Sequence, residues 1–157
     1  MAPSRFDCPL PRASRAGIVT SMSETDVLAA NDAFYRAFAT RDLAAMEALW
    51  AKARPVACIH PGWGPLVTRE AVMESWQAIL TGRNAPRIAC RAAQAYMLGD
   101  TAFVTCFEAV GEACLIATNI FAREDGQWRM VHHQAGPTND APPEPAQTPE
   151  PEKKTVH

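Results

Sequence analysis

The chain has 157 residues, of which 48% are hydrophobic and 20% are charged, and its formal net charge is -2 with a pI of about 6.1. This length suits one domain with a real hydrophobic core and is short for two. A slightly acidic chain offers no basic face to a phosphate backbone, so we expect no nucleic-acid partner. No stretch approaches the roughly twenty apolar residues of a membrane helix, so we expect no membrane insertion.

The two ends of the chain differ in composition from the middle. Residues 1–22 carry three prolines and scattered arginines without a sustained period, which predicts a disordered leader. Met22 precedes a good helix opening, so a natural translation start there is one alternative and a basic targeting sequence is another. Residues 137–157 are rich in Pro and Glu and poor in apolar side chains, which predicts a disordered tail. The domain is therefore expected at residues 23–136.

The first half of this domain predicts three helices. Apolar residues recur at three- and four-residue spacing in "VLAANDAFYRAF", in "LAAMEALW" and in "VMESWQAIL". A short apolar strand, "PVACIH", and a turn, "PGWG", separate the second helix from the third. The residues suited to cap or end the helices are Ser23 for the first, Thr40 or Asp42 for the second, and Thr68 and Gly82 for the third.

The second half predicts four strands in a row. They are "RIACRAAQAYML", "TAFVTCFEAV", "ACLIATNIFAR" and "QWRMVHHQA", joined by tight turns at Gly99 and Asp100, at Gly111 and at "EDG". Strands joined in this way form an antiparallel meander. Helices followed by a meander indicate an α+β domain in which a curved sheet wraps the helices.

The five cysteines are Cys8, Cys58, Cys90, Cys106 and Cys114. Their number is odd, and none stands in the close pairs that structural zinc sites or redox motifs require. We therefore expect reduced thiols in a cytoplasmic protein, with those in the predicted strands acting as small apolar side chains.

Three passages carry a resemblance to a known family: "NDAFYRAFATRDLAAMEALWA", "HPGW" with the following "LVTREAVMESW", and "TNIFAREDGQWRMVHH". Over residues 23–136 the chain resembles the SnoaL-like branch of the nuclear-transport-factor-2-like, or ketosteroid-isomerase-like, superfamily. The resemblance implies a cone-shaped domain in which three N-terminal helices pack in a strongly curved, mostly antiparallel sheet around one apolar pocket, in a homodimer formed through the sheet. Members include isomerases, cyclases, dehydratases and non-catalytic assembly domains, so the resemblance does not decide the chemistry.

Strand alternation predicts which side chains face the pocket. The inner row of one strand reads Ala102, Val104, Cys106 and Glu108, and that of the next reads Leu115, Ala117, Asn119 and Phe121. Similarity to the association domain of calcium/calmodulin-dependent kinase implies that Glu108, Asn119 and Ala135 line the pocket. If Ala135 points inward, His133 does so too, and His132 faces the opposite side.

The segment "CIHPGWG" predicts the mouth of the pocket. His60 ends the short strand, and Pro61 with two glycines allows a turn that places Trp63 over the opening as a lid. The alternative is that Trp63 packs on the edge of the domain. Trp76, from the third helix, either approaches the same mouth or belongs to the core. With Asn119 and Phe121, these two tryptophans are the predicted ligand-binding residues.

Glu108 is the residue that suggests catalysis. Inside an apolar pocket its pKa would rise, and it could act as a general base with His133 or His60 as partner acid. Asn119 would then hold a substrate oxygen. The alternative is an ion pair of Glu108 with Arg91 or Arg129 on the solvated face of the sheet.

His60, His133 and Glu108 could also supply two imidazoles and a carboxylate to a metal ion, but no local signature supports this, so we expect neither a metal nor a cofactor. The sequence thus predicts a protein that binds a small organic molecule. It leaves open whether the protein is a cofactor-free isomerase, dehydratase or cyclase, or a non-catalytic ligand-binding or dimeric assembly module.

Overall fold

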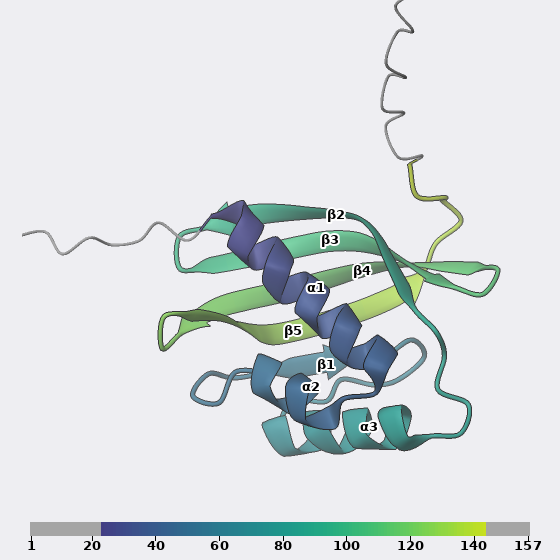
Figure 1. Ribbon diagram of the computed structural model, residues 1–157, viewed down its shortest axis with the longest axis horizontal. Helices are drawn as coiled ribbons and strands as arrows, with labels where there is room; N and C mark the ends of the chain where they lie inside the picture. The colour runs from purple at the N-terminus through teal and green to yellow at the C-terminus, as the bar shows by residue number, and fades with distance from the viewer. Residues whose placement is uncertain (1–22, 144–157) are drawn as a thin grey trace, which may run out of the picture.

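The computed structural model describes residues 23–143, in which three helices accompany one five-stranded sheet (Figure 1). The helices are α1 (Glu24–Thr40), α2 (Leu43–Leu49) and α3 (Arg69–Thr81), and the strands are β1 (Ala57–Ile59), β2 (Ala89–Leu98), β3 (Thr101–Val110), β4 (Ala113–Glu124) and β5 (Gln127–Pro137). This arrangement confirms the predicted α+β class. The expected leader, with Cys8 and the alternative start at Met22, and residues 144–157 of the expected tail lie outside the described residues.

Short polar side chains set the beginning of each helix, as the sequence predicted. Asp26 accepts a hydrogen bond from the backbone N–H of Ser23 at 2.7 Å, in the reciprocal arrangement of a capping box. Asp42, rather than Thr40, caps α2, and Thr68 caps α3, each by accepting from a backbone N–H three residues later. The hydroxyl of Thr40 instead donates back to a carbonyl of its own helix.

The sheet has the strand order β1-β5-β4-β3-β2. Strands β2 to β5 form the predicted antiparallel meander, and β1 adds to its edge in parallel with β5. The pairing register shifts between Arg91 and Gln94 and again between Ile120 and Phe121, and at the first shift Ala92 has a φ of 50°. Because a bulge bends its strand and increases the local twist, these two irregularities curve the sheet around the helices.

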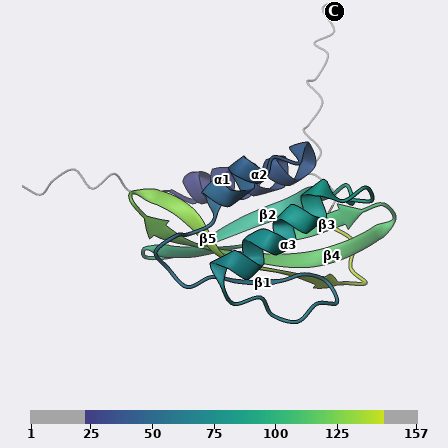
Figure 2. The same ribbon diagram turned by 90° about the horizontal axis from the view of Figure 1, so that it is seen from below.

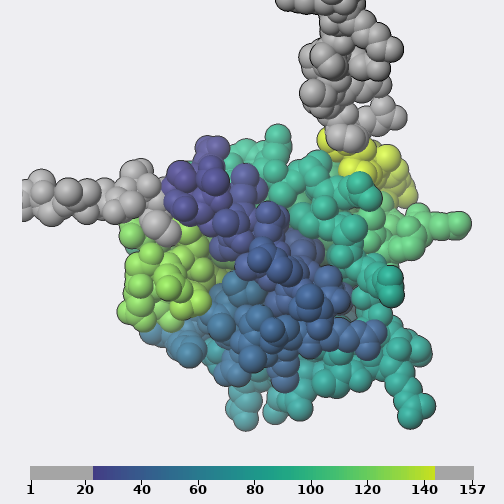
Figure 3. All heavy atoms as spheres, viewed as in Figure 1, coloured from purple at the N-terminus to yellow at the C-terminus, as the bar shows by residue number. Residues whose placement is uncertain are grey.

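The core lies between this curved sheet and the helices (Figures 1 and 2). Helix α1 crosses the inner face and contacts β2, β3 and β5, and the side chains of α1 and α2 close this side of the molecule (Figure 3). Fully buried side chains such as Phe34, Trp50 and Phe121 each contribute about 1.5–3 kcal/mol to folding. None of the helices in residues 23–143 has both the length and the apolar character needed to cross a membrane.

Candidate functional site

A cavity of about 310 Å³ lies between α3, the loop that follows β1, and the paired ends of β3 and β4. We call it the Glu108 cavity. Its walls are mainly apolar and include Phe38, Ile79 and Ile88, and its polar wall groups include the side chains of His60 and Glu108. This volume is near the lower end of the range for small-molecule sites.

Glu108 lies near the C-terminal end of β3, and its side chain is on the buried face of the strand with 2% exposure. Burial raises the pKa of its carboxyl group, and a hydrogen bond of 2.8 Å donated by the Tyr35 hydroxyl to Oε1 partly opposes that rise. Within residues 23–143 no cation pairs with this carboxyl group. The alternative of a solvated ion pair with Arg91 or Arg129 is therefore wrong, and the Arg129 guanidinium donates instead to the Ala48 carbonyl.

Tyr35 connects Glu108 to the interior of the domain. Its hydroxyl proton is directed to Glu108, so its oxygen is left to accept from Asn119 Nδ2 at 3.3 Å and from the thiol of Cys106, whose Sγ is 3.1 Å away. Burial and the nearby Glu108 charge raise the pKa of Tyr35. The phenol therefore stays protonated and acts as a fixed donor to the carboxyl group.

Asn119 and His133 continue this network away from the cavity. Asn119 Nδ2 also donates to Asn31 Oδ1 at 2.7 Å, so its Oδ1 must be the atom that accepts from His133 Nδ1 at 2.6 Å. Burial, aided by His60 and His132, lowers the pKa of His133 to about 3. His133 is consequently neutral, with its proton on Nδ1.

His60 is held by a separate set of contacts. The Ser75 hydroxyl donates to the Val72 carbonyl at 2.7 Å, so His60 Nε2, 2.9 Å from Ser75 Oγ, must carry a proton and donate to that oxygen. Burial lowers the pKa of His60 to about 4, which keeps the ring neutral with a lone pair on Nδ1.

Two tryptophans flank the His60 ring edge to face. The ring centroid of Trp63 is 5.0 Å from that of His60, and the centroid of Trp76 is 4.7 Å from it. Trp63 is 51% exposed at the rim, whereas Trp76 is buried in the wall. Within the described part of the chain, the buried indole N–H of Trp76 has no acceptor. The same holds for the buried indole N–H groups of Trp50 and Trp128, so the Trp76 N–H is enclosed by the protein and would reach a ligand oxygen only if the indole turned.

The predicted site residues fall into three groups. Four line the Glu108 cavity: His60, Trp63, Trp76 and Glu108. Asn119 and His133 are fully buried and lie behind Glu108 in the Tyr35 network, where both polar atoms of Asn119 are already used by protein groups. Phe121 is fully buried in the core and is not part of the cavity wall.

Three polar residues of the site were not predicted from the sequence: Asn31, Tyr35 and Ser75. Asn31 and Tyr35 are one helical turn apart on the apolar stripe of α1, where a polar side chain needs a buried partner. That pattern could have predicted that Asn31 and Tyr35 belong to a buried polar network. No such pattern in the sequence pointed to Ser75, which precedes Trp76 on α3.

No metal-binding cluster is present in the part of the chain that the structure describes. Three or more His, Cys, Asp or Glu side chains do not gather as ligands anywhere in residues 23–143. The two histidines and Glu108 that could have formed such a set take part in the separate contacts given above, and the His60 and His133 ring centroids are 6.5 Å apart.

Residues 27–139 match the family described as the SnoaL-like domain. The F-box protein SKIP8 of Arabidopsis thaliana is 28% identical over 111 residues, which cover 69% of this chain and 48% of that protein, so the chain spans about half the length of this curated relative.

Two solved structures extend the comparison. One, a candidate dehydratase of the NTF2-like family from Streptomyces avermitilis, is 30% identical with a TM-score of 0.67, and the match covers 73% of this chain and 95% of that one. A candidate calcium/calmodulin-dependent protein kinase type II association domain from Thiobacillus denitrificans is 38% identical with a TM-score of 0.60, covering 71% and 94% respectively.

Proposed function

The chain belongs to the SnoaL-like domain family, and on this premise we propose that it binds a small carbonyl compound in the Glu108 cavity and moves a proton on it without a cofactor. The observation that carries the proposal is the buried carboxyl group of Glu108 in the wall of an apolar cavity, held by a neutral donor and not by a cation. A carboxylate in such surroundings is a stronger base than one in water.

The chemistry follows from the donors and acceptors around the cavity. The carboxylate of Glu108 takes a proton from the carbon next to the ligand carbonyl, so that a C–H bond breaks, an O–H bond forms on Glu108, and the electron pair moves onto the carbonyl oxygen. The N–H of Trp76, which has no acceptor among the described residues but is enclosed by the protein, would serve as a donor for that oxygen if the indole turned toward the ligand. Return of the proton to another carbon completes an isomerisation, and its delivery to a departing hydroxyl group completes a dehydration.

The remaining predicted residues position these groups. Tyr35 holds Oε1 of Glu108, and the second carboxyl oxygen carries no hydrogen bond from the described residues. Asn119 and His133 fix Tyr35 from behind, so we assign them to positioning and not to contact with the ligand. His60 Nδ1 carries a lone pair that could accept a hydrogen bond from a ligand hydroxyl group in competition with the buried Cys58 thiol, whose Sγ lies 3.9 Å from it. The 30% identity to a candidate dehydratase supports this class of reaction.

Deuterium uptake tests the proposal without knowledge of the natural substrate. The probe is 2-tetralone, a bicyclic ketone of suitable size, and NMR in D2O follows exchange of its α-protons. We expect catalysed exchange by the wild type and a loss of roughly 10²–10⁴-fold in Glu108→Gln, which keeps the shape but not the base. Glu112→Gln, the same change at an exposed turn position, is the matched control. Exchange by Glu108→Gln at the wild-type rate, or a wild-type rate no faster than that of free acetate, would contradict the proposal.

A second proposed property is a homodimer formed through the outer face of the sheet. Tyr96, Leu98 and Ile116 are exposed there, and Phe103 stacks on Tyr96 with ring centroids 4.6 Å apart. An apolar face of this kind is typical of a protein interface. The 38% identity to a candidate kinase association domain supports the rival function, a non-catalytic assembly module, which would use the same face.

Sedimentation equilibrium tests this interface. We expect a dimer for the wild type and a monomer for Ile116→Glu, because the change puts an unpaired charge in the apolar contact. Val67→Glu places the same charge at another exposed apolar residue, away from the strands, and should leave the dimer intact. A monomeric wild type at high concentration, or an unchanged dimer in Ile116→Glu, would contradict the assignment.

A further inference from the structure

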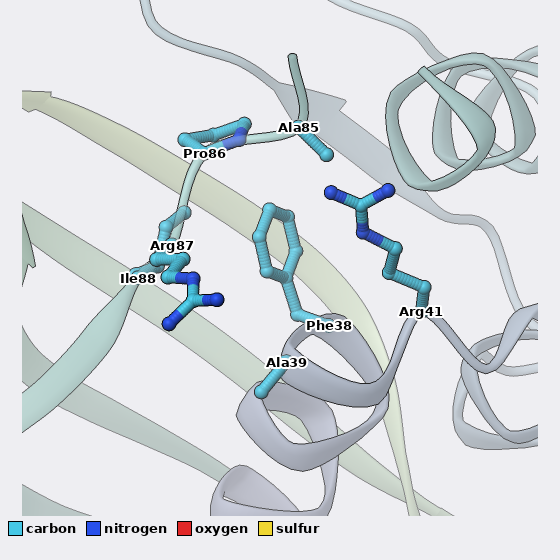
Figure 4. A pocket seen from close by; sticks show the side chains of 7 residues that line it. All are labelled: Phe38, Ala39, Arg41, Ala85, Pro86, Arg87 and Ile88. Carbon is cyan, nitrogen blue, oxygen red and sulfur yellow. The ribbon is translucent and has the colours of Figure 1, made fainter. Parts of the chain in front are cut away.

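A second cavity adjoins the Glu108 cavity. It has a volume of about 500 Å³ and lies between the end of α1 and the segment that joins α3 to β2 (Figure 4). We call it the Arg41 cavity. Phe38, Pro86 and Ile88 line both cavities, so the two are neighbours separated by this one layer of side chains. A ligand that extends out of the Glu108 cavity and past the Phe38 ring would reach the Arg41 cavity.

The Arg41 cavity differs from its neighbour in charge. Arg41 and Arg87 both line it, and their guanidinium groups lie on either side of the Phe38 ring (Figure 4). The ion pairs found within residues 23–143 involve other arginines, so neither of these two is neutralised by an acidic side chain there. Asp42, the acidic residue next to Arg41, uses its carboxylate to cap α2.

The backbone places Arg41 at this cavity. Arg41 is the C-cap of α1 in the left-handed conformation, with a φ of 56°, and its backbone N–H bonds to carbonyls of the last turn. Its guanidinium group lies 3.5 Å from the carbonyl oxygen of Gly82, the C-cap of α3. Because the C-terminal ends of helices attract cations, the two helix ends hold the guanidinium beside the cavity. Its other N–H groups make no hydrogen bond to the residues that the structure describes, so they are available to a ligand.

We propose that the ligand carries an oxyanion, either a carboxylate or a phosphate, which binds Arg41 and Arg87 while its apolar part passes Phe38 and enters the Glu108 cavity. The planar fork of a guanidinium group matches both oxyanions. The carboxylate at the far end repels a second anion, so the charges of the two cavities orient the ligand in one direction. This inference rests on the proposed function, because it assumes that the Glu108 cavity binds the reacting part of the ligand.

Displacement of a fluorescent reporter tests the inference. The reporter is N-phenyl-1-naphthylamine, a neutral apolar dye, and Leu115→Trp, which fills part of the Glu108 cavity, checks that the dye binds there. The competitors share one ring system and differ in charge: 1-naphthaleneacetate, 1-naphthyl phosphate and neutral 1-naphthalenemethanol. We expect at least one anion to compete roughly fivefold to tenfold more tightly than the alcohol, and the better anion identifies the group that the site prefers.

The arginine variants assign this preference to the cavity. In Arg41→Gln with Arg87→Gln the anion should lose its advantage, while binding of the dye and the alcohol changes less than about twofold. Arg83→Gln, an exposed arginine of the same segment outside the cavity wall, should behave as the wild type. Anions and alcohol that compete equally, or an advantage that survives in the double variant, would overturn this inference and leave the proposed function intact. Failure of the dye to bind the wild type would overturn both.

Discussion

The neutral, buried state of His133 predicts a loss of stability in mild acid. The pKa of His133 is lowered from 6.5 to about 3, mainly by burial. Below pH 6.5 the His133 side chain therefore binds a proton in the unfolded chain but not in the folded protein. The contribution of His133 to the unfolding free energy is complete above pH 6.5 and is lost as the pH falls toward the pKa of the folded state. The loss for one such group is about 1.4 kcal/mol per pH unit.

The expected size can be worked out between pH 7.5 and pH 5.5. His133 alone should cost about 1.4 kcal/mol over this interval, and His60, whose pKa is lowered to about 4, should cost about as much. Glu108 acts in the opposite direction, because its raised pKa lets the folded protein bind a proton before the unfolded chain does. The wild type should therefore lose about 1–3 kcal/mol before ordinary carboxylates titrate.

Urea denaturation of wild type and His133→Asn at both pH values isolates the contribution of His133. Asparagine can still donate to Asn119 Oδ1, which His133 Nδ1 contacts at 2.6 Å, but it cannot titrate. The decrease in unfolding free energy from pH 7.5 to pH 5.5 should be about 1.4 kcal/mol smaller in His133→Asn than in the wild type. This difference does not depend on how much the substitution lowers the stability at pH 7.5. His132→Asn, on the opposite side of β5, is the control. An equal drop in wild type and His133→Asn, or an NMR titration of His133 near pH 6.5, would refute the reasoning.

Two further substitutions test the network and the rim. Tyr35→Phe removes the donor to Glu108, so we expect unfolding to become easier by about 1–3 kcal/mol and the exchange of 2-tetralone protons to need a higher pH, because the lost hydrogen bond was lowering the Glu108 pKa. An unshifted pH profile would contradict this role. Trp63→Ala removes a half-exposed indole, so it should weaken N-phenyl-1-naphthylamine binding severalfold while changing the unfolding free energy by less than about 1 kcal/mol. A large stability loss with unchanged dye binding would show instead that Trp63 serves as an edge residue of the core.

Local rules were sufficient for the elements and for which side chains share a face. Ser23 and Thr68 stand at helix starts because an N-cap residue interacts only with the first turn of its helix, so the neighbouring residues are enough to predict it. Ala102, Val104, Cys106 and Glu108 share one face of β3 because side chains alternate along a strand, and the structure shows that this face is the buried one. The same alternation turned His133 inward on β5.

The contacts of those side chains depended on tertiary structure. Tyr35 and Glu108 are 73 positions apart, and His60 and Ser75 come from the loop after β1 and from α3, whose relative placement no local pattern specifies. The bulges in β2 and between β4 and β5 curve the sheet so that its inner face meets α1, and the curvature decides which buried polar groups pair. The sequence therefore determined which residues share a strand face with Glu108, whereas only the fold decided that this face is inside and that a phenol and not an arginine holds the carboxyl group, because burial and hydrogen-bond partners are set by distances across the core.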